Sequence, residues 1–110
     1  MKKDNSLYLK DILKSINRIQ NYSERKTYEQ FCNDYMLQDA IIRNLEIIGE
    51  AANKLDIEFE KDNPSFPIKS VIGMRNILIH NYDQINLERT WNTINTNLPE
   101  LKIIIYKILG

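Results

Sequence analysis

The spacing of apolar residues constrains the fold of this 110-residue chain more than any other feature, because it repeats at steps of three and four along most of the sequence. The longest such stretch runs from about Thr27 to Leu55. Its seam consists of Phe31, Tyr35, Gln38, Ile42, Leu45, Gly49, Ala52 and Leu55. A second strip with Ile41, Ile48 and Ala51 lies beside it, so this helix must be covered on two sides. We expect the chain itself to supply one cover, and a partner subunit could supply the other.

A first helix precedes this stretch. Its apolar residues recur with the helical period from Leu7, and the pattern weakens near Tyr22, where we expect the helix to end. Asp4, Asn5 or Ser6 can cap its start, because short polar side chains accept hydrogen bonds from the first free amides of a helix.

Two prolines, Pro64 and Pro67, break the pattern, since proline cannot sit inside a helix without loss of a hydrogen bond. A third helix is predicted from Ile68 to a loop at residues 81–86, and it is apolar nearly all round, so we expect it to be central and buried. The last helical stretch runs from Leu87 to Leu109, and Pro99 should start a new segment or kink it.

These stretches predict an all-α bundle of four to five helices in one domain over residues 1–110. The 43% hydrophobic content favours a folded domain, and the zero net charge argues against a nucleic-acid packaging protein. One cysteine, Cys32, and one histidine leave no disulfide and no thiolate–imidazole zinc pattern. No leader or membrane-spanning run is visible, so we expect a cytoplasmic protein without a membrane partner.

Polar residues that could carry chemistry interrupt the third helix: Arg75, Asn76, His80 and, just beyond, Tyr82. Each alone has a structural explanation, such as an arginine paired with a carboxylate, but together they favour a functional site. An arginine can hold a phosphate and a histidine can transfer protons near neutral pH. This pair of side chains suits cleavage of a phosphodiester bond. In RNA the 2′-hydroxyl next to that bond can act as the nucleophile, so no metal or other cofactor is needed. Cleavage requires both a base and an acid, and a two-fold dimer would supply a second His80.

The run from Gly73 to Tyr82 resembles the Arg-Asn-x3-His-x-Tyr signature of HEPN-domain proteins, specifically the HepT-like toxins. Three further segments are similar to that family. They are Asp39 to Ala52, which contains Glu-Ile-Ile-Gly-Glu-Ala, the lead-in from Pro67 to Met74, and Trp91 to Leu101. The resemblance covers most of the chain, roughly Leu7 to Leu109.

The resemblance implies an HEPN-type helical bundle that forms a homodimer, with the two motifs facing each other across a cleft. It implies a metal-independent endoribonuclease that acts as the toxin of a type VII-like toxin–antitoxin pair. In that family a small nucleotidyltransferase antitoxin neutralises the toxin by adding AMP to the motif tyrosine. Carried over by position, Arg75 and His80 are catalytic, Asn76 supports them, and Tyr82 is the site of AMPylation.

A second hypothesis gives the chain no catalytic role. On this alternative, Arg75 and His80 would hold a nucleotide, a substrate or the partner enzyme, and catalysis would belong to the nucleotidyltransferase. Cleavage of RNA by the chain alone, abolished by His80→Ala, distinguishes the two hypotheses.

Overall fold

The computed structural model describes residues 4–80, 83 and 85–110, and over these residues it contains helices and no strand, which confirms the predicted all-α class. The helices are α1 (Ser6–Ser23), α2 (Tyr28–Cys32), α3 (Tyr35–Ala52), α4 (Ile57–Asp62), α5 (Ile68–His80), α6 (Leu87–Asn92), a π-helical turn η2 (Thr93–Asn97) and α7 (Leu98–Leu109). The predicted loop at 81–86 falls partly outside the described residues.

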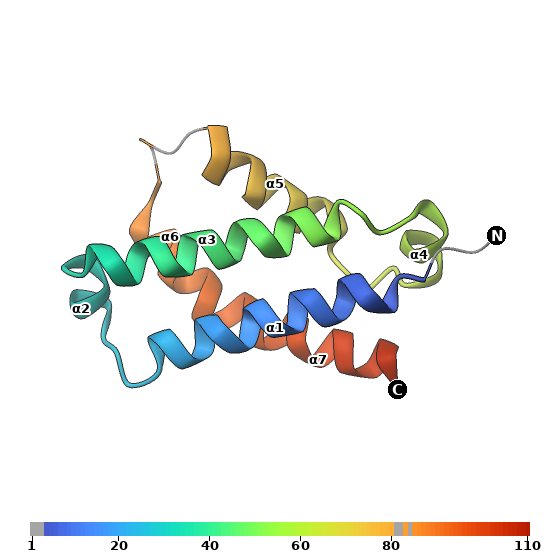
Figure 1. Ribbon diagram of the computed structural model, residues 1–110, viewed down its shortest axis with the longest axis horizontal. Coiled ribbons are helices and arrows are strands. Elements are labelled where there is room, and N and C mark those ends of the chain that lie inside the picture. Colours follow the sequence, from blue (N-terminus) through green and yellow to red (C-terminus); the bar gives the residue numbers. More distant parts are fainter. Residues whose placement is uncertain (1–3, 81–82, 84) are drawn as a thin grey trace.

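The centre of the molecule is an antiparallel pair of long helices, α1 and α3, with α7 packed along α1 (Figure 1). The buried face of α1 carries Leu9, Ile12, Ile16 and Ile19. Lys102 of α7 donates from Nζ to Gln20 Oε1 of α1 at 2.9 Å. Burial of this apolar face, rather than helix propensity alone, accounts for the stability of these helices.

The start of α1 lies in the segment predicted to cap it. Asp4 accepts hydrogen bonds from the backbone amide and the hydroxyl of Ser6, at 3.0 and 2.6 Å. These bonds lower the pKa of the Asp4 carboxyl, the side-chain bond most strongly. Asn5 occupies the cap position itself without a side-chain cap bond.

The prediction of one continuous helix from Thr27 to Leu55 is wrong, because the chain breaks between α2 and α3. Asp34 adopts an extended backbone and accepts a bond from the Leu37 amide at 3.0 Å, so it caps a new helix. Gln38 then donates back to the carbonyls of Phe31 and Cys32, which ties the end of α2 to the first turns of α3. The short helix α4, capped by Asp56, was not predicted because six residues are too few to show a period.

The two apolar sides of α3 are covered by α1 and by α5 of the same chain. A partner subunit is therefore not needed to cover α3, contrary to the expectation from its two apolar strips. Among the large apolar side chains of α3, only Tyr35 and Met36, at its start, are mostly exposed.

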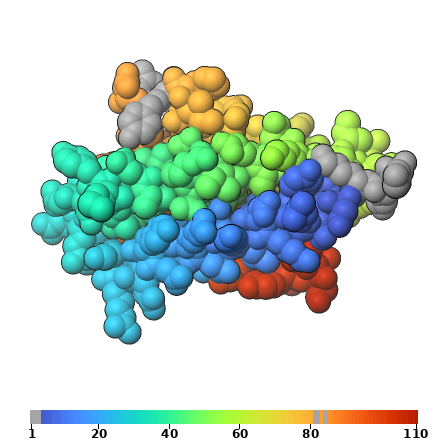
Figure 2. Space-filling view, in the orientation of Figure 1, coloured from blue at the N-terminus to red at the C-terminus, as the bar shows by residue number. Residues whose placement is uncertain are grey.

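The prediction that the third helix is central and buried is also wrong. Helix α5 packs along one side of α3 at the edge of the bundle, and Figure 2 shows it raised above the surface formed by α1 and α3. Only Ile68, Val71 and Leu78 of α5 are buried, whereas Ile77 and Ile79 are 50% and 37% exposed. Apolar residues on a helix show which face is suited to burial. They do not show whether another part of the same chain packs on that face.

The last helical stretch has the predicted limits and the predicted break. The π-helical turn at residues 93–97 separates α6 from α7, and Pro99 sits in the first turn of α7. Proline has no amide to donate to the preceding turn, so a wider turn before it is an expected adjustment.

Candidate active site

Arg75 is fixed to the bundle through its aliphatic stem. A Cβ atom placed on Gly49 of α3 would lie 2.1 Å from Cβ and 2.7 Å from Cγ of Arg75. Since any larger residue would clash there, Gly49 lets α5 approach α3 closely and leaves room for the first carbons of the Arg75 side chain. The glycine in the Glu-Ile-Ile-Gly-Glu-Ala run therefore has a structural reason.

Within the described part of the chain, the guanidinium of Arg75 makes one side-chain hydrogen bond and no ion pair. It donates from Nη1 to Asn76 Oδ1 at 3.2 Å, and its Nε is buried without a hydrogen-bond partner among those residues. No ion pair between Arg75 and a carboxylate occurs among the described residues. Glu50, a carboxylate on the neighbouring helix α3, instead forms an ion pair with Arg43, with 3.5 Å between Glu50 Oε1 and Arg43 Nη1. A buried donor without a partner is costly, and an anionic oxygen would satisfy it.

Asn76 and His80 are one helical turn apart, and both are exposed on α5. His80 is the last residue of the helix, and in the described part of the chain it makes no hydrogen bond to Arg75 or Asn76. The structure thus brings Arg75 and Asn76 into contact and leaves His80 exposed at the end of α5, one turn beyond Asn76. Tyr82, the predicted modification site, lies outside the described residues.

An apolar cavity of about 740 Å³ separates α5 from α6 and α7. Its lining residues on α5 include Met74 and Ile77, and Leu101 and Ile104 line it from α7. Asn86 and Arg89 of the α6 region stand at the same cavity. One side of the α5 helix therefore faces an open, largely apolar space rather than the packed core.

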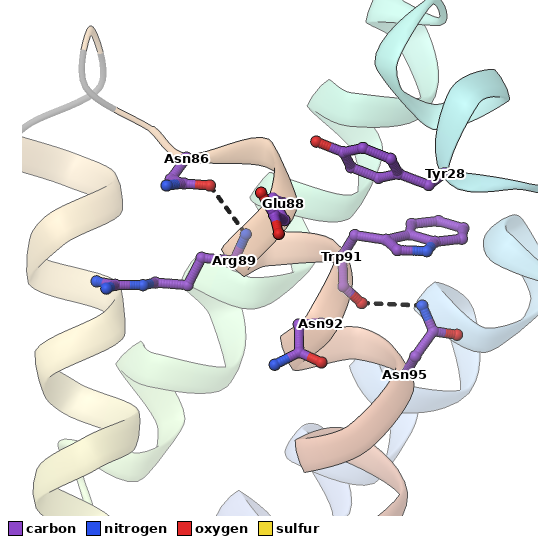
Figure 3. Close-up of a pocket in the computed structure, with 7 residues that line it drawn as sticks. All are labelled: Tyr28, Asn86, Glu88, Arg89, Trp91, Asn92 and Asn95. Carbon is purple, nitrogen blue, oxygen red and sulfur yellow. Dashed lines mark hydrogen bonds between the residues drawn. The ribbon is translucent and has the colours of Figure 1, made fainter.

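A second cavity of about 870 Å³ was not predicted from the sequence. Figure 3 shows the seven residues that line it: Tyr28, Asn86, Glu88, Arg89, Trp91, Asn92 and Asn95. Trp91 stacks on Phe31 at 5.1 Å between ring centroids, and this contact joins α2 to α6. The sequence signal was the group of asparagines around Trp91, but their meeting with Tyr28 depends on the tertiary fold.

The pKa of the Tyr28 phenol is raised above its ordinary value of 10, chiefly by a hydrogen bond with the Cys32 side chain. Tyr28 is therefore neutral at physiological pH. No group of three or more potential metal ligands occurs among the residues that the structure describes. Within the same residues, no helix is long and apolar enough to cross a membrane.

Comparison with known proteins shows which family this chain belongs to. Residues 12–108 match the model of the family described as HepT-like, Ribonuclease HepT-like. The chain belongs to this HepT-like ribonuclease family. The predictions of a HepT-like HEPN protein and of a ribonuclease are thereby confirmed.

Several similar proteins carry related names. The "Gamma-glutamylcyclotransferase and putative RNase" of Methanocaldococcus jannaschii is 42% identical over 109 residues, which are 99% of this chain and 49% of that protein. The chain thus spans about half the length of that relative. A "Putative RNase" of the same organism is 38% identical over 92% of this chain and 93% of its own length. The "Probable ribonuclease HepT" of Thermococcus cleftensis is 35% identical over 93% of each chain. No solved structure matches this chain.

Proposed function

We propose that this ribonuclease is a metal-independent endoribonuclease toxin whose site combines Arg75, Asn76 and His80 from two copies of the chain. The observation that carries the proposal is the Arg75 guanidinium, which is anchored on Gly49. Its buried Nε has no partner among the described residues, Asn76 accepts from its Nη1, and exposed His80 lies one helical turn beyond Asn76. A guanidinium that no carboxylate neutralises among the described residues is suited to the oxygens of a phosphodiester, and the family supplies RNA as the substrate class.

The chemistry follows from these groups. Arg75 holds the scissile phosphate and stabilises the charge that grows on its oxygens, while Asn76 keeps the guanidinium in place through the 3.2 Å hydrogen bond. One His80 accepts the proton of the 2′-hydroxyl as that oxygen attacks phosphorus, and the other donates a proton to the departing 5′-oxygen. The products are a 2′,3′-cyclic phosphate and a 5′-hydroxyl.

A homodimer is needed because one chain carries a single histidine. Support for the dimer comes from α5, since Ile77 is 50% exposed and lines the apolar cavity. Exposed apolar surface next to a charged site is typical of surfaces that contact another protein. A second copy of the chain that covers this surface would bring its own His80 to the same cleft.

We also propose that the chain is one half of a toxin–antitoxin pair and that a partner nucleotidyltransferase AMPylates Tyr82. Tyr82 follows His80 by two residues in the sequence. An added AMP brings negative charge and bulk close to Arg75, so the phosphate of an RNA strand would be repelled and blocked. The same charge would attract Arg75 itself, which would hold the modified tyrosine over the site.

Purified chain and single-stranded RNA test the catalytic part of the proposal. Arg75→Ala should abolish cleavage, and Arg75→Lys should restore little of it, because lysine cannot make two parallel hydrogen bonds to one phosphate. Arg43→Ala is the matched control, since it removes another helical arginine whose visible partner is a surface carboxylate. Equal cleavage by Arg75→Ala and Arg43→Ala would contradict the assigned role.

Intact-mass measurement tests the regulatory part. Co-expression with the proposed nucleotidyltransferase partner should add whole AMP units, and Tyr82→Phe should prevent the addition while RNA cleavage persists. A stable complex without any mass change would instead favour inhibition by binding. If the lone chain also fails to cleave RNA, the non-catalytic binding role becomes the better explanation.

A further inference from the structure

The cavity between α2 and α6, shown in Figure 3, has a composition that differs from the site on α5. Its walls carry two aromatic rings and three asparagine amides, and its two charged residues, Glu88 and Arg89, have opposite signs. A lone phosphate is not attracted to such a balanced site. A flat, neutral group with donors and acceptors along its edge fits it better, and an unpaired nucleobase is such a group.

One of the two aromatic rings packs against the bundle, and the other is exposed to solvent. Trp91 is half-buried and rests on Phe31, whereas Tyr28 is 41% exposed. The centroids of the Tyr28 and Trp91 rings are 6.4 Å apart with an angle of 49° between their planes, so the two rings form a wedge and are not stacked on each other. The open ring of Tyr28 therefore offers a stacking surface at the mouth of the cavity.

The amides have spare hydrogen-bonding capacity of both kinds. Asn95 Nδ2 donates to the Trp91 carbonyl at 2.9 Å, which leaves its Oδ1 as an acceptor (Figure 3). Asn92 Oδ1 accepts from the Thr96 hydroxyl at 3.4 Å, which leaves its Nδ2 as a donor. The lining of the cavity therefore offers both a donor and an acceptor, the two kinds of group that the edge of a base carries.

Arg89 connects this cavity to the proposed catalytic site. Its side chain points away from the rings and toward α5, the helix that carries Arg75 and His80 (Figure 3). Arg89 and Asn86 line both cavities. A strand whose base occupies the ring cavity would thus pass its phosphate by Arg89 on the way to α5.

We propose that this cavity binds one unpaired base of the RNA substrate, with Tyr28 as the stacking surface and the amides of Asn92 and Asn95 at the base edge. The inference rests on the proposed ribonuclease function and narrows its substrate to single-stranded RNA, because a base paired in a duplex cannot reach the ring. Arg89 holds the phosphate that links this base to the scissile bond.

Binding of a short single-stranded oligoribonucleotide with 2′-O-methyl groups throughout tests the proposal, because this probe has no nucleophile and stays intact. Trp91 is the sole tryptophan of the chain, so a base in the cavity should quench its fluorescence. Tyr28→Leu should raise the Kd of the probe about tenfold or more, the effect expected for loss of one stacked base, and should reduce the quenching. Tyr28→Phe keeps the ring and should bind as the wild type does.

Two controls separate stacking from a general loss of fold or charge. Tyr106→Leu removes another exposed ring, on α7 toward the opposite end of the molecule, and should leave the Kd unchanged (Figure 1). A second probe lacks only the base that would occupy the cavity. Its Kd for the wild type should equal the Kd of the intact probe for Tyr28→Leu. With that abasic probe, Tyr28→Leu should cause no further loss.

The outcomes distinguish this inference from the proposed function. If wild-type protein cleaves RNA in an Arg75-dependent way but Tyr28→Leu binds the probe with wild-type Kd, the base site is wrong and the ribonuclease stands. If every abasic position is tolerated equally by wild type, the base site is wrong as well. If the wild type neither cleaves nor binds RNA, both proposals fail together.

Discussion

Replacing Gly49 with alanine tests the contact that fixes Arg75 in the proposed active site. The added methyl carbon would lie 2.1 Å from Arg75 Cβ, 2.7 Å from Cγ and 3.4 Å from Cα. A Cβ atom cannot rotate away from its own backbone, so relief of the clash requires α5 to move off α3 or rotate. Either movement displaces the guanidinium.

The free-energy change has two opposing contributions. Extra volume at a closely packed contact costs about 1–3 kcal/mol. Alanine stabilises a helix by about 0.5–1 kcal/mol relative to glycine, which offsets part of this cost. The two contributions leave a net loss of about 0–2.5 kcal/mol of unfolding free energy. Because the clash is with Cβ of Arg75, which cannot rotate away, we expect Gly49→Ala to lie in the upper part of this range, at about 1–2.5 kcal/mol or about 4–20 °C in Tm. Displacement of the guanidinium should also lower kcat/KM for RNA cleavage by about 10- to 100-fold.

Gly73→Ala is the matched control within the same pair of helices. An added Cβ at Gly73 meets nothing within 4 Å, so only the helix-propensity gain remains. Thermal unfolding should show Gly73→Ala above the wild type in Tm, by the equivalent of about 0.5–1 kcal/mol, and Gly49→Ala below it. A Gly49→Ala variant that is as stable and as active as the wild type would refute the close contact between Gly49 and Arg75.

Three further predictions concern the dimer, the first helix and the core. In mixtures of wild type with His80→Ala that exchange subunits freely, cleavage should fall as the square of the wild-type fraction, whereas a linear fall would indicate independent chains. Asp4→Asn should lower Tm at neutral pH. Because the pKa of Asp4 is lowered in the folded state, this difference should be present above the ordinary carboxyl value and should vanish as pH falls below about 4; a constant difference would argue against the Ser6 hydrogen bonds. Phe31→Ala should cost about 3–5 kcal/mol in urea denaturation and shift Trp91 fluorescence, since Phe31 is fully buried against that ring; a smaller loss would contradict this packing.

The sequence period predicted the long helices because burial of an apolar face is what holds them. It missed the break before Asp34, since the apolar spacing of the sequence continues across it and the capping signal spans a single residue. Tyr35, which that spacing placed in the seam, is 78% exposed, and Leu37 is buried instead. The sequence period overestimated the burial of α5 for a related reason. The period shows which residues are apolar, but the coverage of Ile77 and Ile79 depends on neighbours that the sequence does not identify.

For the candidate site as well, some features could be predicted from the sequence and others depend on tertiary packing. The residue types and spacing of Arg75, Asn76 and His80 were enough to propose a candidate site from the sequence, and this part stays a prediction. The burial that first drew attention to these residues is not found, since Asn76 and His80 are exposed. The role of Gly49 becomes visible only in the packing of α3 on α5. The cavity at Tyr28 depends on the contact of α2 with α6, which joins segments far apart in the chain.

Cleavage of one defined single-stranded RNA by the purified chain tests the central claim most directly, with the products identified by their ends. We expect wild-type protein to leave a 2′,3′-cyclic phosphate and a 5′-hydroxyl, and a 2′-deoxy substitution at the scissile position to block cleavage there. His80→Ala should reduce the rate by about 10²- to 10⁴-fold, the usual contribution of a catalytic acid or base. Undiminished cleavage by His80→Ala, or cleavage next to the 2′-deoxy position, would contradict the proposed mechanism.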